Sequence, residues 1–148
     1  MLVQTTRFGQ IQGSQDEVIV FPHGLIGFES SRHWLIVPDP ENEDVAWLQS
    51  LTQMQVALPL VSPRKYAPDY KVCVPKRHLE PLSLRKTDRV YVLVVVSKSG
   101  RTLTANLRSP IVLNLTKRLA SQVIASDSLP LAMPISVGSA GTGLRVAA

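Results

Sequence analysis

The chain has 148 residues, of which 45% are hydrophobic and 18% charged, and its formal net charge is +5. This length predicts a single domain with a sizeable core, and no apolar run approaches the roughly 20 residues of a membrane-spanning helix. The first residues lack the basic and apolar regions of a signal peptide, and Cys73 is the only cysteine. We therefore expect a cytoplasmic protein that has no internal disulfide and no contact with a membrane.

The chain carries short apolar runs bounded by glycine, proline or polar residues, which is typical of β-strands. In chain order, these runs cover residues 2–7, 10–12, 18–21, 33–37, 45–51, 56–61, 70–74, 89–96, 103–107, 111–115 and 119–125. The run at 89–96 is the most apolar and predicts a central strand, with a turn at 97–100. Residues 76–84 predict about two helical turns at most, because Pro81 interrupts them.

These elements predict a mainly β fold. We expect a small single-domain β-barrel-like fold of about ten short strands with at most one or two short helices, because closing a sheet hides its edges. The domain is predicted to cover residues 1–127. Residues 128–148 lack any hydrophobic period and are predicted to form a flexible C-terminal tail.

Charge is distributed unevenly along this domain. Residues 1–44 hold two basic and seven acidic side chains, whereas residues 45–148 hold fourteen basic and four acidic ones. Such asymmetry can indicate nucleic-acid binding. The basic residues come in separated pairs, however, so scattered charge on a solvated β-surface is the simpler interpretation.

The most unusual stretch is the turn that follows the run at 18–21. Pro22 removes a backbone donor and ends the strand, while Gly24 and Gly27 allow conformations that other residues rarely adopt. Most turns are polar between such residues, but this one carries large apolar side chains. It is either a buried bend that closes the β-structure or an apolar loop offered to a partner.

The same stretch, Phe21-Pro22-His23-Gly24-Leu25-Ile26-Gly27-Phe28-Glu29, resembles the Phe-Pro-x-Gly-x-x-Gly-Phe-Glu motif of the flagellar assembly factor FliW family. Two further segments match in the same order. They are Leu48-Gln49-Ser50 and the stretch from Asn106 to Asn114, where the family usually reads Asn-Leu-Gln-Ala-Pro-Ile-Val-Ile-Asn. Arg108 and Ser109 depart from the usual Gln-Ala, and the positive net charge departs from the acidic balance of many FliW-like chains.

This resemblance implies a compact β-barrel-like fold and a non-catalytic regulator that binds proteins. FliW-like proteins bind flagellin, the filament subunit, and CsrA, a dimeric RNA-binding translational repressor. Flagellin that accumulates in the cytoplasm occupies the FliW-like protein, which also gives it a chaperone-like role. Once flagellin is secreted, the released protein antagonises CsrA away from its RNA surface and relieves repression of flagellin synthesis. Neither direct nucleic-acid binding nor a small-molecule substrate is implied.

The motifs also supply candidate partner-binding residues. We predict that Phe21 and the glycines shape the loop, whereas Ile26, Phe28 and Glu29 lie nearer the surface, and that Asn106 to Pro110 forms a second rim. The complete set of predicted partner-binding residues is Phe21, Pro22, Gly24, Ile26, Gly27, Phe28, Glu29, Asn106, Arg108 and Pro110.

Signatures of catalysis and of cofactor binding are missing from the sequence. His23, His33 and His78 have no second ligand at metal-binding spacing, and neither Gly-x-Ser-x-Gly nor a Gly-Lys-Ser/Thr loop is present. Cys73 lies between two valines and is expected in the core. We expect no enzyme activity, no metal and no cofactor.

Binding of single-stranded nucleic acid is the alternative function. A small basic β-barrel can bind single strands when exposed aromatic side chains offer stacking platforms. Tyr66 and Tyr70, beside Arg64, Lys65 and Lys71, are the only aromatic residues with such surroundings in the sequence. A surface loop with no binding role is the simpler interpretation of that patch.

Overall fold

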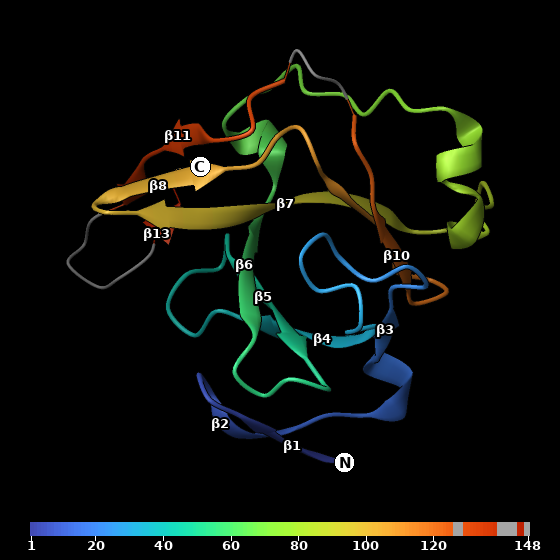
Figure 1. The fold of residues 1–148 in the computed structure, drawn as a ribbon, viewed down its shortest axis with the longest axis vertical. Helices are drawn as coiled ribbons and strands as arrows, with labels where there is room; N and C mark the ends of the chain where they lie inside the picture. Colours follow the sequence, from blue (N-terminus) through green and yellow to red (C-terminus); the bar gives the residue numbers. More distant parts are fainter. Residues whose placement is uncertain (126–128, 139–144, 147–148) are drawn as a thin grey trace.

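The computed structural model describes residues 1–125, 129–138 and 145–146, and their regular structure is almost entirely β-strand (Figure 1). The strands are β1 (Leu2–Thr5), β2 (Gly9–Gln12), β3 (Ile19–Val20), β4 (His33–Pro38), β5 (Ala46–Ser50), β6 (Ala57–Val61), β7 (Val90–Ser99), β8 (Thr102–Ala105), β9 (Ile111–Asn114), β10 (Leu119–Gln122), β11 (Met133–Ile135), β12 (Val137–Gly138) and β13 (Arg145–Val146). Four single-turn 3-10 helices, more than predicted, accompany them: η1 (Gln15–Glu17), η2 (Pro63–Lys65), η3 (Lys76–His78) and η4 (Glu80–Leu82).

Seven strands close into a barrel, which confirms the predicted fold class. Neighbouring strands follow the order β7-β6-β5-β4-β3-β10-β9, and β9 pairs back onto β7. Every pairing in the ring is antiparallel except that of β10 with β3, where Leu119 lies opposite Val20. Closure pairs most of the ladder groups that an open sheet would leave at its edges. The β1–β2 hairpin lies outside the ring (Figure 1).

Several strands bury side chains on both faces, which produces two main hydrophobic clusters. One gathers around Phe21, Trp34 and Leu60 inside the ring. The other gathers around Trp47, Tyr70 and other side chains near the β7–β8 hairpin. The rings of Phe21 and Trp34 meet edge to face, with centroids 6.1 Å apart, an arrangement that adds to the energy of burial. The barrel therefore has a packed interior, and the turn between β3 and β4 packs against it through Phe21.

Two strand predictions are wrong in detail. The predicted turn at 97–100 begins later, because β7 runs on to Ser99, which pairs with Thr102 across a two-residue turn at Gly100. The predicted strand at 70–74 does not form. Instead, the buried Tyr70 hydroxyl donates a hydrogen bond to the Leu107 carbonyl oxygen at 2.6 Å. The segment is thus held by a side-chain hydrogen bond instead of by strand pairing. The prediction that Cys73 lies in the core is wrong, because Cys73 is exposed.

The structure also corrects part of the predicted tail. Residues Met133–Ile135 form β11, which pairs with β8, and Ile135 is buried in the cluster that contains Trp47. Pro134 is compatible with this strand because β11 is an edge strand. The predicted boundary between residues 127 and 128, and the tail residues 139–144 and 147–148, lie outside the described residues. None of the helices in the described part is long and apolar enough to cross a membrane.

Candidate partner-binding site

The turn between β3 and β4, residues 21–31, is closed at both ends by backbone hydrogen bonds. The Phe21 amide donates to the Arg32 carbonyl oxygen at 2.8 Å, and the Ser31 amide donates to the Phe28 carbonyl oxygen at 3.0 Å. Inside the turn, Leu25 and Phe28 form an isolated antiparallel bridge. Leu25 is buried, whereas Phe28 is half-buried with its ring edge to face against Trp34. The turn, which we call the apolar loop, is therefore a compact bend that is packed on the core.

The two motif glycines differ in the structural constraint that excludes a side chain. Both adopt positive φ, +68° at Gly24 and +88° at Gly27. At Gly24 a Cβ would also lie 2.5 Å from the carbonyl oxygen of Glu29, whereas at Gly27 it would meet open space. Gly24 is thus required by both backbone conformation and close approach, but Gly27 only by conformation.

The second motif, Leu48-Gln49-Ser50, supports the far end of this loop. The buried hydroxyl groups of Ser50 and Ser31 are hydrogen-bonded at 2.6 Å, and the indole Nε1 of Trp34 donates to the Ser31 carbonyl oxygen at 2.9 Å. Ser50 also accepts a hydrogen bond from the Gln53 amide at 3.0 Å. The β5–β6 turn and the apolar loop are therefore joined through two serines.

Gln122, at the end of β10, connects the first motif to the third. Its Oε1 accepts a hydrogen bond from the Ile26 amide at 2.9 Å, and its Nε2 donates to the Ser109 carbonyl oxygen at 3.0 Å. One side chain thus fixes the tip of the apolar loop, 96 residues away in sequence, against the Asn106–Pro110 segment.

The Asn106–Pro110 segment is itself a fixed turn. Asn106 Oδ1 accepts hydrogen bonds from the amides of Arg108 and Ser109, at 3.1 and 3.0 Å. Arg108 Nε donates to the Leu129 carbonyl oxygen at 3.0 Å, and the Leu107 amide donates to the carbonyl oxygen of Pro130 at 3.0 Å. This segment therefore joins the barrel to the chain that leads into β11, which is a structural role.

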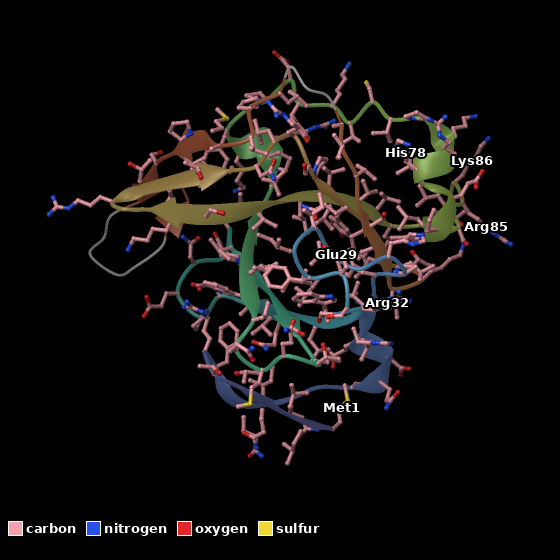
Figure 2. All side chains as sticks on the ribbon, viewed as in Figure 1. Met1, Glu29, Arg32, His78, Arg85 and Lys86 are labelled. Atoms are coloured by element: carbon pink, nitrogen blue, oxygen red, sulfur yellow. The ribbon has the colours of Figure 1, made fainter. Side chains whose placement is uncertain are left out.

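Apolar side chains remain exposed beside Gln122. Ile26 is 60% exposed at the loop tip, and Ile124, two residues beyond Gln122, is 58% exposed. A shallow groove of about 350 Å³ runs alongside, and its lining residues are His23, Arg77, His78, Pro81, Ser121, Gln122, Val123 and Ile124. Figure 2 shows His78, Arg85 and Lys86 projecting from the connection between β6 and β7, which gives this side of the molecule a basic rim.

The predicted site residues fall into three groups by exposure. Phe21, Gly24 and Pro110 are buried; Pro22, Phe28, Asn106 and Arg108 are half-buried; and Ile26, Gly27 and Glu29 are exposed. The expectation that Phe21 and Gly24 shape the loop agrees with their burial. Contact of any of these residues with a partner stays a prediction.

Gln122, Ile124 and the groove on the β10 side were not predicted. Gln122 gave no sequence signal, because its two partners lie far away along the chain. Ile124 did offer one, since an isoleucine that follows the end of a strand and alternates out of phase with Val123 points away from the core.

The tyrosines of the predicted basic-aromatic patch do not form a stacking surface. Tyr70 is buried and Tyr66 is half-buried. Burial raises the pKa of each phenol to about 12, with the Asp44 carboxylate adding to the rise at Tyr66. Among the described residues, no group of three or more His, Cys, Asp and Glu side chains is placed to hold a metal ion.

Together these features define a small closed β-barrel that displays a hydrogen-bonded apolar loop beside a shallow groove. The family model described as "FliW protein" matches residues 2–135. A flagellar assembly factor FliW from Bdellovibrio bacteriovorus is 36% identical over 130 residues, which is 86% of this chain and 74% of that protein. The factor from Moorella thermoacetica is 37% identical over 127 residues, which is 84% of this chain and 80% of that protein.

A solved structure agrees with these sequence matches. The crystal structure of a flagellar assembly factor FliW superposes with a TM-score of 0.81 at 26% identity, covering 90% of this chain and 94% of that one. The chain therefore belongs to the FliW family.

Proposed function

We propose that this protein is a flagellar assembly factor that acts in the cytoplasm as a non-catalytic regulator. In this proposal it binds flagellin and, when flagellin is absent, binds CsrA and relieves repression of flagellin synthesis. Membership of the FliW family supports the general role. The choice of partners rests on the resemblance of the three motifs.

The observation that carries the proposal is the pair of exposed isoleucines on a rigid frame. The side-chain amide of Gln122 accepts the hydrogen bond of the Ile26 amide at the loop tip, and Ile124 lies two residues beyond Gln122. An exposed apolar side chain on a backbone that is already fixed loses less entropy on binding than one on a loose loop, so it is well suited to anchor a partner. We infer that the loop tip and the adjoining groove form the partner-binding surface.

The switch itself follows from mass action. A protein shared by two partners transmits the concentration of one to the other, because each complex lowers the amount of free protein. The action on CsrA is then a coupling between the surface of CsrA that is occupied and its separate RNA surface. No chemical step by this chain is required.

The test measures binding of purified flagellin and CsrA from the same cell by titration calorimetry. The variant Ile26→Ser/Ile124→Ser should weaken at least one of the two complexes about tenfold, equivalent to about 1.4 kcal/mol, with its unfolding midpoint unchanged. Met54→Ser is the matched control, because Met54 is 53% exposed on the β5–β6 turn, away from the groove. It should change neither affinity more than twofold.

Two results would contradict this proposal. If the wild-type protein binds neither partner at micromolar concentration, the regulator role is wrong. If both complexes form and the double isoleucine variant binds both as tightly as the control, the binding surface lies elsewhere. Saturation with flagellin should also raise the CsrA concentration needed for half-binding.

Single-stranded RNA binding remains the competing function, and the burial of the two predicted stacking residues argues against it. The two tyrosines that would have offered stacking platforms are buried or half-buried. An RNA oligonucleotide should therefore bind weakly, and only at low salt. Tight binding of RNA without CsrA, with a steep salt dependence, would favour this alternative.

A further inference from the structure

The first half of β7 has a partner strand on one side only. Residues Val90 to Leu93 pair with β9. On the other side, β6 pairs with β7 only where Leu60 lies opposite Val95 and Val61 opposite Val94. After Val61 the chain turns away into η2. Residues 90–92 therefore form an open strand edge, since none of the described strands pairs with them on that side.

The backbone groups of Val90 and Val92 face this open side. The Leu115 amide donates to the Arg89 carbonyl oxygen at 2.8 Å, so the backbone groups of Arg89, and of Tyr91 and Leu93 after it, point toward β9. Because backbone groups alternate sides along an antiparallel strand, those of Val90 and Val92 point the other way. Such a row of donors and acceptors is a template for an added strand.

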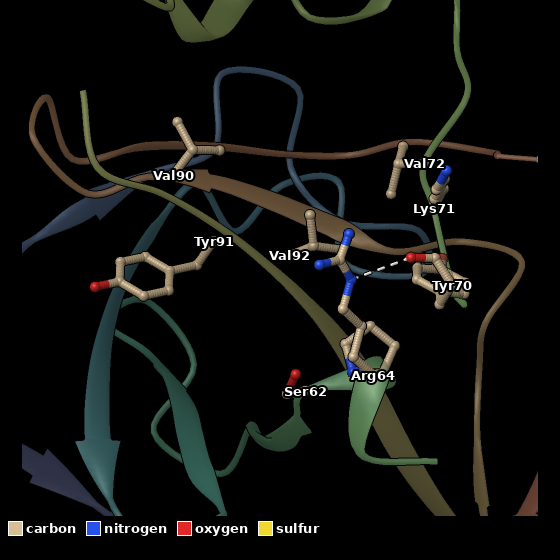
Figure 3. Close-up of a pocket in the computed structure, with 9 residues that line it drawn as sticks. Ser62, Arg64, Tyr70, Lys71, Val72, Val90, Tyr91 and Val92 are labelled. Carbon is tan, nitrogen blue, oxygen red and sulfur yellow. Dashed lines mark hydrogen bonds between the residues drawn. The ribbon is translucent and has the colours of Figure 1, made fainter. Parts of the chain in front are cut away.

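A groove runs along this edge instead of a neighbouring strand (Figure 3). Its volume is about 300 Å³, and its lining residues are Ser62, Pro63, Arg64, Tyr70, Lys71, Val72, Val90, Tyr91 and Val92. The opposite wall is the segment 70–72, which forms no ladder with β7. Val90 and Tyr91 are 44% and 42% exposed, so apolar surface is available next to the open backbone groups.

One cation is already oriented in this groove. Arg64 Nε donates to the Tyr70 carbonyl oxygen at 3.2 Å, and Figure 3 shows the guanidinium between Val92 and Tyr70. The remaining guanidinium N–H groups could donate to a carboxylate or carbonyl acceptor placed in the groove. Lys71 lines the same groove, and Arg89, just before the start of β7, donates to the Tyr91 hydroxyl at 3.1 Å.

The positive charges at this groove indicate which kind of ligand it can bind. None of the lining residues is acidic, so pairing of two copies edge to edge would place Arg64, Lys71 and Arg89 of each copy against those of the other. Like charges across a strand pair are unfavourable, whereas opposite charges stabilise it. We propose that the groove binds an extended acidic peptide of a partner protein, which adds to β7 as a strand. The groove shares no residue with the surface proposed above, so this inference is independent of that function.

The test uses the full-length protein and a labelled peptide of alternating glutamate and valine, seven residues long, with glutamate at both ends. We expect binding that saturates below 1 mM, and a lysine–valine peptide of equal length should bind at least tenfold more weakly. Arg64→Glu should weaken binding of the glutamate peptide at least tenfold. Lys98→Glu makes the same change of charge on β7 beyond the groove and should change affinity less than threefold.

Amide hydrogen exchange, measured residue by residue, then separates strand addition from simple charge attraction. Saturating peptide should slow exchange of the Val90 and Val92 amides at least tenfold, whereas the Tyr91 amide, already directed at β9, should change little. Absence of binding at 1 mM, equal binding of the lysine peptide, or unchanged exchange at Val90 and Val92 would each overturn the proposal. Concentration-dependent dimerisation without peptide, accompanied by slowed exchange at Val90 and Val92, would show that a second copy occupies the edge and would overturn it as well.

Discussion

Two connections of the barrel, the apolar loop at 21–31 and the β6–β7 connection at 62–89, are built on opposite principles. The short one is fixed at its far end and its tip by hydrogen bonds to β4, β5 and β10. The long one crosses the surface through three single-turn 3-10 helices and reaches the core mainly through Tyr70 and Leu82. The comparison indicates that a short connection with closely spaced anchors positions a surface, whereas a long one with widely spaced anchors covers the core.

The first way to break this comparison is Gly24→Val in the apolar loop. Valine would have to adopt positive φ here, and its Cβ would lie 2.5 Å from a backbone oxygen. Backbone strain and overpacking together should therefore cost about 4 kcal/mol of stability. Urea unfolding measures this loss. Gly27→Val is the matched control, because a Cβ there meets open space, and it should cost about 1–2 kcal/mol. Equal losses would show that the loop has no tight approach at Gly24.

The corresponding change in the long connection is Leu82→Ala. Leu82 is fully buried against Val112 and Val123, so its truncation should cost about 2–3 kcal/mol, toward the low end for a buried leucine because a cluster at the periphery can relax. Leu84→Ala, two residues on and 38% exposed, should cost much less. A loss at Leu82 as large as that of Gly24→Val would remove the proposed difference between the two connections.

The apolar loop was the easier of the two to predict from sequence. Proline, two glycines and four large apolar side chains within nine residues leave few possible conformations, and family resemblance added two supporting motifs. The closed barrel was also predictable, since frequent breakers between short β-branched runs favour it. The contacts through Gln122 were not, because they depend on which distant segments the barrel brings together.

Predictions for the long connection and the C-terminal segment were less accurate for a physical reason. The stretch at 70–74 has a strand-like composition, yet the burial of Tyr70 and its hydrogen bond to Leu107 determine its path. Tertiary contacts here override local propensity. Likewise, Met133–Ile135 contains a proline and little pattern, but pairing with β8 and the burial of Ile135 make it an edge strand.

A smaller effect is expected when one anchor of the apolar loop is removed. Gln122→Ala deletes hydrogen bonds to Ile26 and to Ser109, which should cost about 1–2 kcal/mol and loosen the loop tip. Faster hydrogen exchange at the Ile26 amide is the specific readout. Gln55→Ala, an exposed glutamine in the β5–β6 turn, should leave both quantities unchanged. If Ile26 exchange does not respond to loss of Gln122, the tip is held by packing instead.

The smallest effect concerns the end of the long connection, where Asp88 meets the barrel. Asp88 Oδ2 accepts a hydrogen bond from Asn114 Nδ2 at 2.9 Å and lies 3.2 Å from Lys117 Nζ. The Asn114 hydrogen bond, together with the Arg85 amide and Lys117, holds the pKa of this carboxyl below its usual value. A carboxylate with a lowered pKa in the folded state stabilises the protein above its unfolded pKa of about 3.9. That contribution is lost as the pH falls through the folded value.

Comparison of wild type with Asp88→Asn at several pH values therefore provides the last test. The wild type should be more stable at pH 7 and at pH 5 by the same small margin, and this margin should shrink below about pH 4 as the carboxylate becomes protonated. Thr87→Ser, next to Asp88 but without an ionisable group, should differ from wild type by an amount that does not depend on pH. A margin for Asp88→Asn that persists unchanged at pH 2 would mean that the side chain acts through shape and not through charge. The long connection would then lack the electrostatic anchor that we assign to its end, and its contrast with the hydrogen-bonded apolar loop would be sharper still.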